Sequence, residues 1–375
     1  MPMRTRSTLT HMLAVVLALG LTTGAARATD GTHRQALKAG AVKVVPVKTG
    51  LNVPSGFTFS PDSRIWYLER LTGQVRVLNL KTGTDRLFFD ITKVNGSGER
   101  GALGIALHPK WPAKPWVYVY ATRQGHSGLE NQLLRIHAVD GKGAGYRVLF
   151  RSPVSSATNH NGGRILFGPD GKLYAIDGEN ANPANSQDLT GNLMGKILRI
   201  NADGSIPKTN PFGTRVWAYG IRNSFGFTFD PRTDKLWETE NGPECNDEIN
   251  VIRKGGNFAW GPSESCGSRS APHDTNRDGP SPRLLPKTWF VDTIGITGAA
   301  FCHRCGLGAS FAGDLLFGDV NDGILRAAQL NDARTDVAST RQVVAQGTGL
   351  HSMEVAPSGR IYFSGSSGIY RLVPA

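Results

Sequence analysis

The sequence predicts an all-β fold, a six-bladed β-propeller with four-stranded antiparallel blades. One phrase recurs six times: a short apolar strand, a turn containing Pro, Asp or Gly, and a second strand rich in Tyr, Trp or Leu. The copies begin at Gly56, Leu103, Gly163, Gly226, Gly298 and Ser352. A repeat that forms about four antiparallel strands cannot bury both faces alone, so the copies are expected to stack radially into a ring. A solenoid is the competing architecture, but regular solenoid units are shorter and less variable.

Each copy carries the residues that its turns and strands need. In "GRILFGPDGKLYAID", which begins at Gly163, Pro fixes φ, Asp caps its own backbone and Gly accepts a positive φ. The flanking strands are mostly β-branched or aromatic at alternate positions, which suits a sheet that packs one face on its neighbour. Several copies continue into a further strand, as in "GQVRVLNL" and "GKILRIN", and an inserted loop is expected at residues 267–288.

The first 28 residues are expected to lie outside the fold. Arg4 and Arg6 precede an apolar run at residues 12–21, and "ARA" at residues 26–28 provides small residues for signal peptidase. The run is too short to span a bilayer, and no later stretch is long enough, so no integral membrane segment is expected in the mature chain. We therefore predict a signal peptide at residues 1–28, a propeller at 29–375, and a periplasmic or secreted location.

The charge of the chain argues against nucleic acid as a partner. The formal net charge is +12, but the Lys and Arg residues are scattered singly rather than grouped in runs. A basic surface that attracts anions in general accounts for this composition.

The four cysteines are expected to form disulfides in an oxidising compartment. Proximity in the sequence suggests Cys245 with Cys266 and Cys302 with Cys305, although three connectivities are possible. The "CHRCG" stretch lacks the C-x-x-C-H order of covalent haem attachment. A zinc site that uses His303 would need further ligands.

Four stretches stand out from the repeats and carry candidate chemistry. They are "GSGERGALG" with Glu99, "NHNGGR" with His160, "YGIRNSFGF" with Arg222 and Asn223, and "ETENGPECNDEINVIRKGGNFAWG". Taken alone, each has an ordinary explanation: a loop histidine is more often a surface residue, and an arginine often pairs with an acid. In a propeller, however, the loops before the inner strands converge on the central channel. Three of these stretches precede inner strands and the fourth follows one, so they are expected to meet there.

The same stretches resemble a known family. "GALGIALHP", "NHNGGRILFGPDGKLY", "GKILRINADGSIPKTNPF", "YGIRNSFGFTFDP" and "NGPECNDEINVIRKGGNFAWG" run from about residue 101 to 261. They are similar to the soluble quinoprotein, PQQ-dependent glucose/sorbosone dehydrogenases, which are six-bladed propellers that act on aldose sugars. The resemblance implies pyrroloquinoline quinone (PQQ) and calcium in the central channel and oxidation of a sugar at its anomeric carbon.

The resemblance also assigns roles to residues of this chain. It makes His160 the general base that removes the hydroxyl proton, and histidine titrates close to neutral pH. Arg222 and Asn223 would contact the quinone oxygens, where negative charge develops. Glu99 lies where the family often has a polar residue near cofactor and substrate.

Two calcium sites follow from the same resemblance. The carbonyls of Gly242 and Pro243 would bind the catalytic calcium, a hard cation that prefers oxygen ligands. Glu248 and the carbonyl of Phe258 resemble a second, structural calcium site. The stretch "DTNRDG" at residues 274–279 begins like a calcium loop, but Leu285 stands at its twelfth position instead of Glu. That stretch is either a calcium site or an Asx-rich turn.

The chain departs from the family in three places. The resemblance predicts a Lys in the fifth blade and two Arg in the sixth, which would contact the carboxylates of the cofactor. Asn321 replaces the Lys, and His351 and Met353 replace the arginines. Either other basic residues compensate, or the ligand differs, or the propeller no longer catalyses.

The leading hypothesis is therefore an exported, PQQ-dependent sugar dehydrogenase that passes electrons to a separate acceptor. No G-x-G-x-x-G opens a helix after a strand, which disfavours a nicotinamide enzyme, and no G-x-S-x-G elbow is present. One alternative is a non-catalytic propeller that binds a glycan or a protein. Another is a calcium-dependent lactonase, which rests on analogy of fold alone.

Overall fold

The structure is a computed structural model, and it describes residues 42–262, 266, 283–345 and 349–375. The chain divides into two units, residues 1–35 and 36–375, and all described residues belong to the second. The predicted signal peptide, the "DTNRDG" stretch and most of the predicted inserted loop lie outside the described residues.

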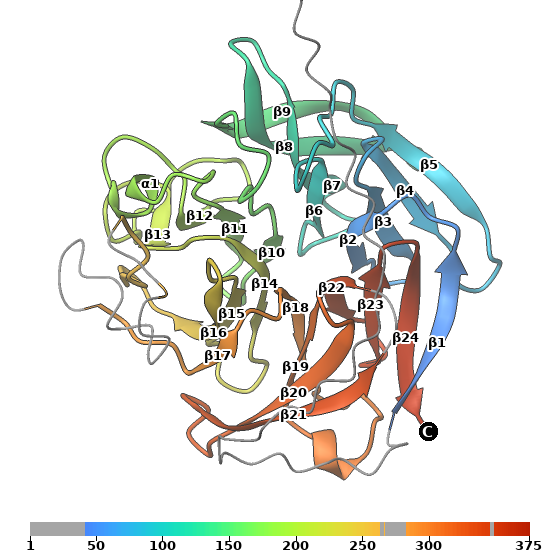
Figure 1. Ribbon diagram of the computed structural model, residues 1–375. Coiled ribbons are helices and arrows are strands. Elements are labelled where there is room, and N and C mark those ends of the chain that lie inside the picture. The colour runs from blue at the N-terminus through green and yellow to red at the C-terminus, as the bar shows by residue number, and fades with distance from the viewer. Residues whose placement is uncertain (1–41, 263–265, 267–282, 346–348) are drawn as a thin grey trace, which may run out of the picture. The chain divides into compact units, whose positions relative to one another are not determined.

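The described part of the second unit consists of six four-stranded antiparallel sheets arranged around a centre (Figure 1). The predicted six-bladed β-propeller is therefore confirmed. Blades 1 to 3 are β2 (Pro54–Phe59), β3 (Ile65–Glu69), β4 (Gln74–Leu78) and β5 (Asp85–Asp90); β6 (Ala102–Leu107), β7 (Trp116–Gln124), β8 (Leu129–Val139) and β9 (Lys142–Pro153); and β10 (Ile165–Phe167), β11 (Leu173–Asp177), β12 (Lys196–Ile200) and β13 (Val216–Tyr219).

The remaining three blades follow the same plan. They are β14 (Ser224–Phe229), β15 (Leu236–Glu240), β16 (Cys245–Ile252) and β17 (Thr288–Asp292); β18 (Ile296–Phe301), β19 (Leu315–Asp319), β20 (Ile324–Leu330) and β21 (Val337–Ala345); and β22 (Leu350–Val355), β23 (Ile361–Gly365), β24 (Gly368–Pro374) and β1 (Val42–Thr49). Two short helices, α1 (Ala184–Gln187) and the 3-10 helix η2 (Ala309–Phe311), lie in loops. Among the described residues, no helix combines the length and apolarity needed to cross a membrane.

The ring is closed by the first strand of the fold. β1 is the outer strand of blade 6 and pairs antiparallel with β24, from Val42 opposite Pro374 to Thr49 opposite Gly368. The last repeat supplies only three strands, so a segment that precedes the first repeat completes it. Backbone hydrogen bonds between the two ends of the propeller therefore hold the ring shut.

Large side chains fill the spaces between neighbouring blades. Tyr118 and Tyr120 on β7 are fully buried and pack with Leu173 on β11 and Leu198 on β12. Burial of a side chain of this size contributes about 1.5–3 kcal/mol relative to exposure. The repeated aromatic and aliphatic positions of the sequence are thus the contacts between blades.

Both cysteine pairs are joined as proximity in the sequence suggested. Cys245 is bonded to Cys266, with 5.9 Å between their Cα atoms, and Cys302 to Cys305, with 5.0 Å between theirs. The second bond leaves no thiolate beside His303, which removes the basis for a zinc site there.

Arg164 links four blades at the centre of the ring. It directly precedes β10 in blade 3, and its Nε donates to the carbonyl of Phe225 at 2.7 Å. Its Nη1 donates to the carbonyl of Leu103 at 2.5 Å, and its Nη2 donates to the carbonyl of His351. These acceptors belong to or adjoin the inner strands of blades 4, 2 and 6. Burial, opposed by the charge of Glu354, lowers the pKa of Arg164 to about 10, so the guanidinium is still a cation at neutral pH.

Asp247 joins blade 4 to the start of blade 5. Its Oδ2 accepts hydrogen bonds from the backbone N–H groups of Ile294 at 2.9 Å, Gly295 at 2.7 Å and Ile296 at 3.2 Å. Its Oδ1 accepts from the N–H of Gly242 at 2.9 Å. One buried carboxylate therefore satisfies four backbone donors.

We predict that Asp247→Asn destabilises the fold by about 2 kcal/mol, because an amide presents one donor to N–H groups that need an acceptor. The free energy of unfolding from a denaturant titration measures this effect. Asp332→Asn is the matched control, since Asp332 lies exposed in a turn. Equal unfolding free energies for the two variants would show that the carboxylate does not hold the blades together.

Candidate active site

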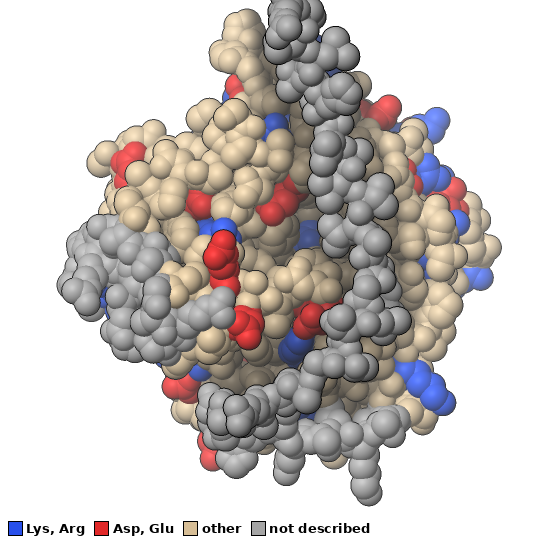
Figure 2. Space-filling view, in the orientation of Figure 1, with Lys and Arg blue, Asp and Glu red and all other residues tan. Residues whose placement is uncertain are grey.

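A cavity of about 450 Å³ lies where the inner strands of the six blades converge. Residues from all six blades line it. Figure 2 shows a hollow at the centre of one face, with basic and acidic side chains around it. Six of the eight predicted site residues line this cavity: Glu99, His160, Arg222, Asn223, Gly242 and Pro243. The predicted convergence of the loops is therefore confirmed for these residues.

His160 is held by two carboxylates. Its side chain lies among buried residues with 7% exposure, and its Nδ1 is 2.5 Å from Oε1 of Glu179. A carboxylate can only accept a hydrogen bond, so Nδ1 carries a proton, and in the neutral tautomer the lone pair is on Nε2. Oε2 of Glu179 accepts from the N–H of Asn182 at 2.5 Å, which fixes the carboxylate in turn. The backbone N–H of His160 donates to Oε2 of Glu99 at 2.7 Å.

The same oxygen of Glu99 also positions Asn223. The Nδ2 of Asn223 donates to Oε2 of Glu99 at 3.0 Å, so one carboxylate connects the loops before the inner strands of blades 2, 3 and 4. Asn223 is 2% exposed, and its Oδ1 has no hydrogen-bond partner among the described residues. Asn223 lines the cavity, so this unpartnered oxygen lies at its wall.

Arg222 lies between the central cavity and a smaller one, and it lines both. Its Nη1 donates to the carbonyl of Asn241 at 2.9 Å, and its guanidinium packs over the ring of Trp260 at 5.2 Å. Its Nε has no partner within the described part of the chain. Burial lowers the pKa of Arg222, and the charges of Glu179, Glu240 and Glu99 oppose this shift.

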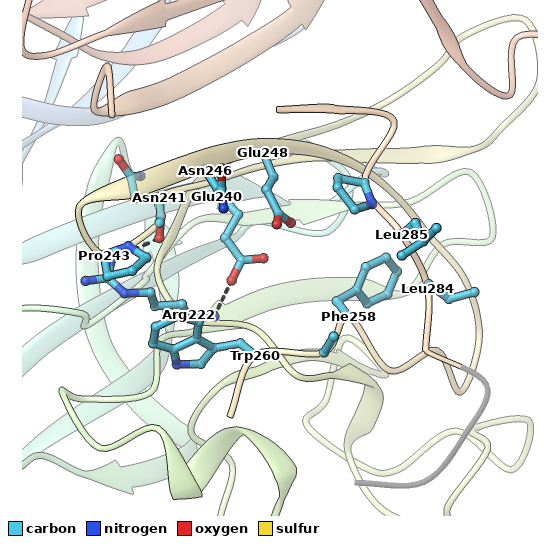
Figure 3. Close-up of a pocket in the computed structure, with 13 residues that line it drawn as sticks. Arg222, Glu240, Asn241, Pro243, Asn246, Glu248, Phe258, Trp260, Leu284 and Leu285 are labelled. Carbon is cyan, nitrogen blue, oxygen red and sulfur yellow. Dashed lines mark hydrogen bonds between the residues drawn. The ribbon is translucent and has the colours of Figure 1, made fainter. Parts of the chain in front are cut away.

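The smaller cavity, of about 20 Å³, has room for one water molecule or ion (Figure 3). Glu248 and Phe258, the two remaining predicted residues, line it together with Glu240 and Asn246. Glu240 on β15 stands directly opposite Glu248 on β16 in the sheet. Figure 3 shows their carboxylates pointing toward the same space. Like charges in this arrangement destabilise a sheet unless a cation or a proton lies between them.

The electrostatics of this cluster disfavour ionised carboxylates. Burial raises the pKa of Glu240 well above its usual value, and the charges of Glu238 and Glu248 raise it further. Burial also raises the pKa of Glu238 to about 7. Oε2 of Glu240 and both side-chain polar atoms of Asn246 have no partner among the described residues. These buried oxygens suit a hard cation.

Gly242 and Pro243 form the wall between the two cavities, since both residues line both. A Cβ at Gly242 would lie 1.8 Å from the carbonyl oxygen of Cys245, so only glycine fits there. The "NGPE" turn is thus packed too tightly for a larger residue and is anchored through Asp247.

The three residues that depart from the family pattern do not all line the central cavity. Asn321 and His351 line the central cavity, whereas Met353 is 4% exposed and packs in the core formed by blades 5 and 6. Two arginines not singled out in the sequence, Arg70 and Arg164, also line the cavity. Burial and the charges of Arg164 and Arg70 lower the pKa of His351 to about 4, so this histidine is neutral at neutral pH.

Sequence reasoning missed Glu179, Glu240, Arg70 and Arg164. The two glutamates have a local signal: Glu179 lies two residues beyond a predicted strand, and Glu240 is the second of two alternate glutamates on an apolar strand. An ionisable residue at a position expected to be buried indicates a partner.

Comparison with known proteins finds relatives that are named as sugar dehydrogenases and one that carries a different name. It is 32% identical over 248 residues to quinoprotein glucose dehydrogenase B of Acinetobacter calcoaceticus, a match that covers 57% of this chain and 51% of that protein. The chain thus spans about half the length of this relative. It is 31% identical over 217 residues to the human (Homo sapiens) Hedgehog-interacting protein, covering 47% of this chain and 30% of that protein.

A solved structure agrees over most of the fold. The PQQ-bound form of aldose sugar dehydrogenase from Streptomyces coelicolor superposes with a TM-score of 0.74 and 26% identity, over 90% of this chain and 98% of that chain. The family model for Glucose / Sorbosone dehydrogenase matches residues 51–372, which include all six blades apart from β1 and the end of β24. The chain therefore belongs to the Glucose / Sorbosone dehydrogenase family.

Proposed function

We propose that this protein is a PQQ-dependent aldose dehydrogenase that oxidises a sugar at its anomeric carbon. The observation that carries the proposal is the His160–Glu179 pair, which faces the same cavity as Arg222 and Asn223. A histidine oriented by a buried carboxylate and opening into a cavity has the arrangement of a general base. The family membership makes the sugar and the quinone the expected ligands.

The residues of the chain would divide the reaction between them. PQQ, when bound, supplies the acceptor for the hydride that leaves the anomeric carbon. His160 takes the proton of the anomeric hydroxyl on Nε2, and the sugar becomes a lactone. Glu179 keeps Nδ1 protonated and stabilises the imidazolium that forms. The cationic Arg222 stabilises negative charge that develops on an oxygen bound in the cavity.

Calcium fits two places in this structure. Gly242 and Pro243 would bind the calcium of the central cavity through their carbonyls. Glu248 and the carbonyl of Phe258, together with Glu240, would hold the second ion in the smaller cavity. Within the described residues no three His, Cys, Asp or Glu side chains form a metal cluster by themselves, so backbone oxygens must complete either site. The unpartnered oxygen of Glu240 supports the second site.

We also infer export to the periplasm or the medium and transfer of electrons to a separate acceptor. The apolar N-terminal segment with its preceding arginines supports export. Two disulfides within the described residues agree with an oxidising compartment.

A non-catalytic binding propeller is the second candidate. The replacement of three expected cations by Asn321, His351 and Met353 favours it, as does the similarity to a Hedgehog-interacting protein. It leaves the buried His160–Glu179 pair without a role. Among the described residues, no contact favours the lactonase alternative over these two.

Reconstitution of the purified protein with PQQ and calcium, followed by dye reduction with a panel of aldoses, tests the proposal. We expect turnover that needs both additions, and a fall in kcat of roughly 10² to 10⁴ for His160→Ala because the proton acceptor is lost. His126→Ala, in an exposed loop, is the control and should leave the rate unchanged. Turnover that survives in His160→Ala removes the base from the mechanism, and failure of the wild-type protein to bind PQQ favours the binding propeller.

Glu179→Gln tests the orienting carboxylate separately from the base. The amide no longer fixes the proton on Nδ1, so we expect kcat to fall by at least roughly 10-fold and by up to about 10⁴, while PQQ affinity stays the same. The pH dependence of kcat should change as well. Glu130→Gln, which alters contacts with Arg151 and Gln132 outside the central cavity, is the matched control. An unchanged kcat and pH profile would show that Glu179 does not act through His160.

The second calcium site predicts a stability that depends on pH. The pKa of Glu238 is about 7 in the fold against an ordinary 4.5, and that of Glu240 is also raised, so the calcium-free fold binds more protons than the unfolded chain. Stability is therefore greatest below about pH 4.5 in this respect and falls as the pH rises toward about 7. Calcium replaces those protons, so it should raise Tm more at about pH 8 than at about pH 5.

Thermal unfolding with calcium or with a chelator at the two pH values measures this difference. Glu248→Gln should reduce the gain in Tm at the higher pH and leave the central cavity intact. If calcium raises the Tm of the wild-type protein equally at both pH values, a calcium ion at these carboxylates is contradicted.

A further inference from the structure

Three basic groups that line the central cavity have no part in the proposed chemistry. Arg70 follows β3 in blade 1, Arg164 precedes β10 in blade 3, and His351 lies on β22 in blade 6. All three line the cavity, and they are close enough that the charges of both arginines depress the pKa of His351. Three separate blades thus direct basic groups toward one region.

The two arginines are fixed and still have N–H groups to offer. Each nitrogen of Arg164 donates one hydrogen bond to a backbone carbonyl, which leaves two of its five N–H groups, one on each Nη. Arg70 donates through Nη1 to the carbonyl of Arg100 at 2.8 Å and to the carbonyl of Gly98. The guanidinium positions are therefore set before any ligand binds, which lowers the entropic cost of binding.

The surrounding acids do not neutralise this region. Glu354 is the acid that acts on Arg164, and burial, opposed by the charge of Arg164, raises the pKa of Glu354 to about 8. Glu354 is therefore mostly protonated at neutral pH. The charge of Glu99 acts on Arg70, but the two form no ion pair among the described residues, and Oε2 of Glu99 accepts instead from His160 and Asn223. Two fixed cations that face a partly desolvated cavity attract an anion.

We propose that Arg70, Arg164 and His351 form a carboxylate-binding subsite that holds an anionic edge of the cofactor in place of the missing Lys and Arg pair. The inference rests on the proposed function, because the ligand is the triply carboxylated quinone. The guanidinium groups bind a carboxylate through charge-assisted hydrogen bonds. His351 contributes a neutral ring beside them, with Nε2 3.4 Å from Oγ of Ser366.

Equilibrium binding, followed by quenching of tryptophan fluorescence, tests the subsite without catalysis. The probes are PQQ and its trimethyl ester, which keeps the rings and the quinone but has no carboxylates, both with calcium present. We expect Arg70→Gln to weaken the binding of PQQ by about 10- to 100-fold and to leave the binding of the ester unchanged. Arg64→Gln, on the same blade with its side chain outside the cavity, is the matched control and should bind like the wild type.

Two further variants separate a charge effect from a change in the loop that carries Gly98 and Arg100. Arg70→Lys keeps the charge and should retain most of the PQQ affinity. His351→Arg restores a fixed cation and should tighten the binding of PQQ several-fold, again without an effect on the binding of the ester. If Arg70→Gln and His351→Arg both bind PQQ with the affinity of the wild-type protein, the subsite is overturned but the proposed function is not. No binding of PQQ by the wild-type protein overturns both.

Discussion

The guanidinium of Arg164 is the contact on which the centre of this propeller depends. Four inner strands or their adjoining loops meet at one side chain, which donates to carbonyls of three other blades. A buried cation is costly unless it is hydrogen-bonded, and three backbone carbonyls supply most of the acceptors that Arg164 needs without a paired anion. The consequence is a fixed positive charge in the wall of the cavity, where the chain lacks the cations expected from its family.

Carboxylates hold the loops around this centre. Glu99 connects three blades, Glu179 orients His160, and Asp247 joins blade 4 to blade 5. In each case, the acid accepts hydrogen bonds from groups that a loop would otherwise leave unsatisfied. Glu240 and Glu248 differ, because they face each other across a sheet, and burial together with the charge of Glu248 raises the pKa of Glu240. The proposed calcium site would therefore couple the stability of blade 4 to ion binding.

The sequence was sufficient for the architecture and for the residues that stand before the inner strands. The repeated Pro, Asp and Gly turns specify local strand pairs, and the ring follows because each pair must bury a second face. It did not reveal that β1 completes blade 6, since that strand lies outside the repeats and pairs with the far end of the chain. Arg70 and Arg164 were missed for a related reason. Their importance arises from contacts between blades, and nothing in "ERLTG" or "GGRIL" indicates which carbonyls from other blades will lie nearby.

The most direct measurement is a crystal structure of the protein prepared with PQQ and calcium. We predict one cofactor in the central cavity, with its quinone oxygens nearest Arg222 and Asn223, a carboxylate at Arg70 and Arg164, and Nε2 of His160 facing the space left for the sugar. A calcium ion should lie at the carbonyls of Gly242 and Pro243. A cavity that stays free of the quinone at saturating concentration, or a quinone bound elsewhere on the propeller, would contradict the assignment of this cavity as a dehydrogenase active site.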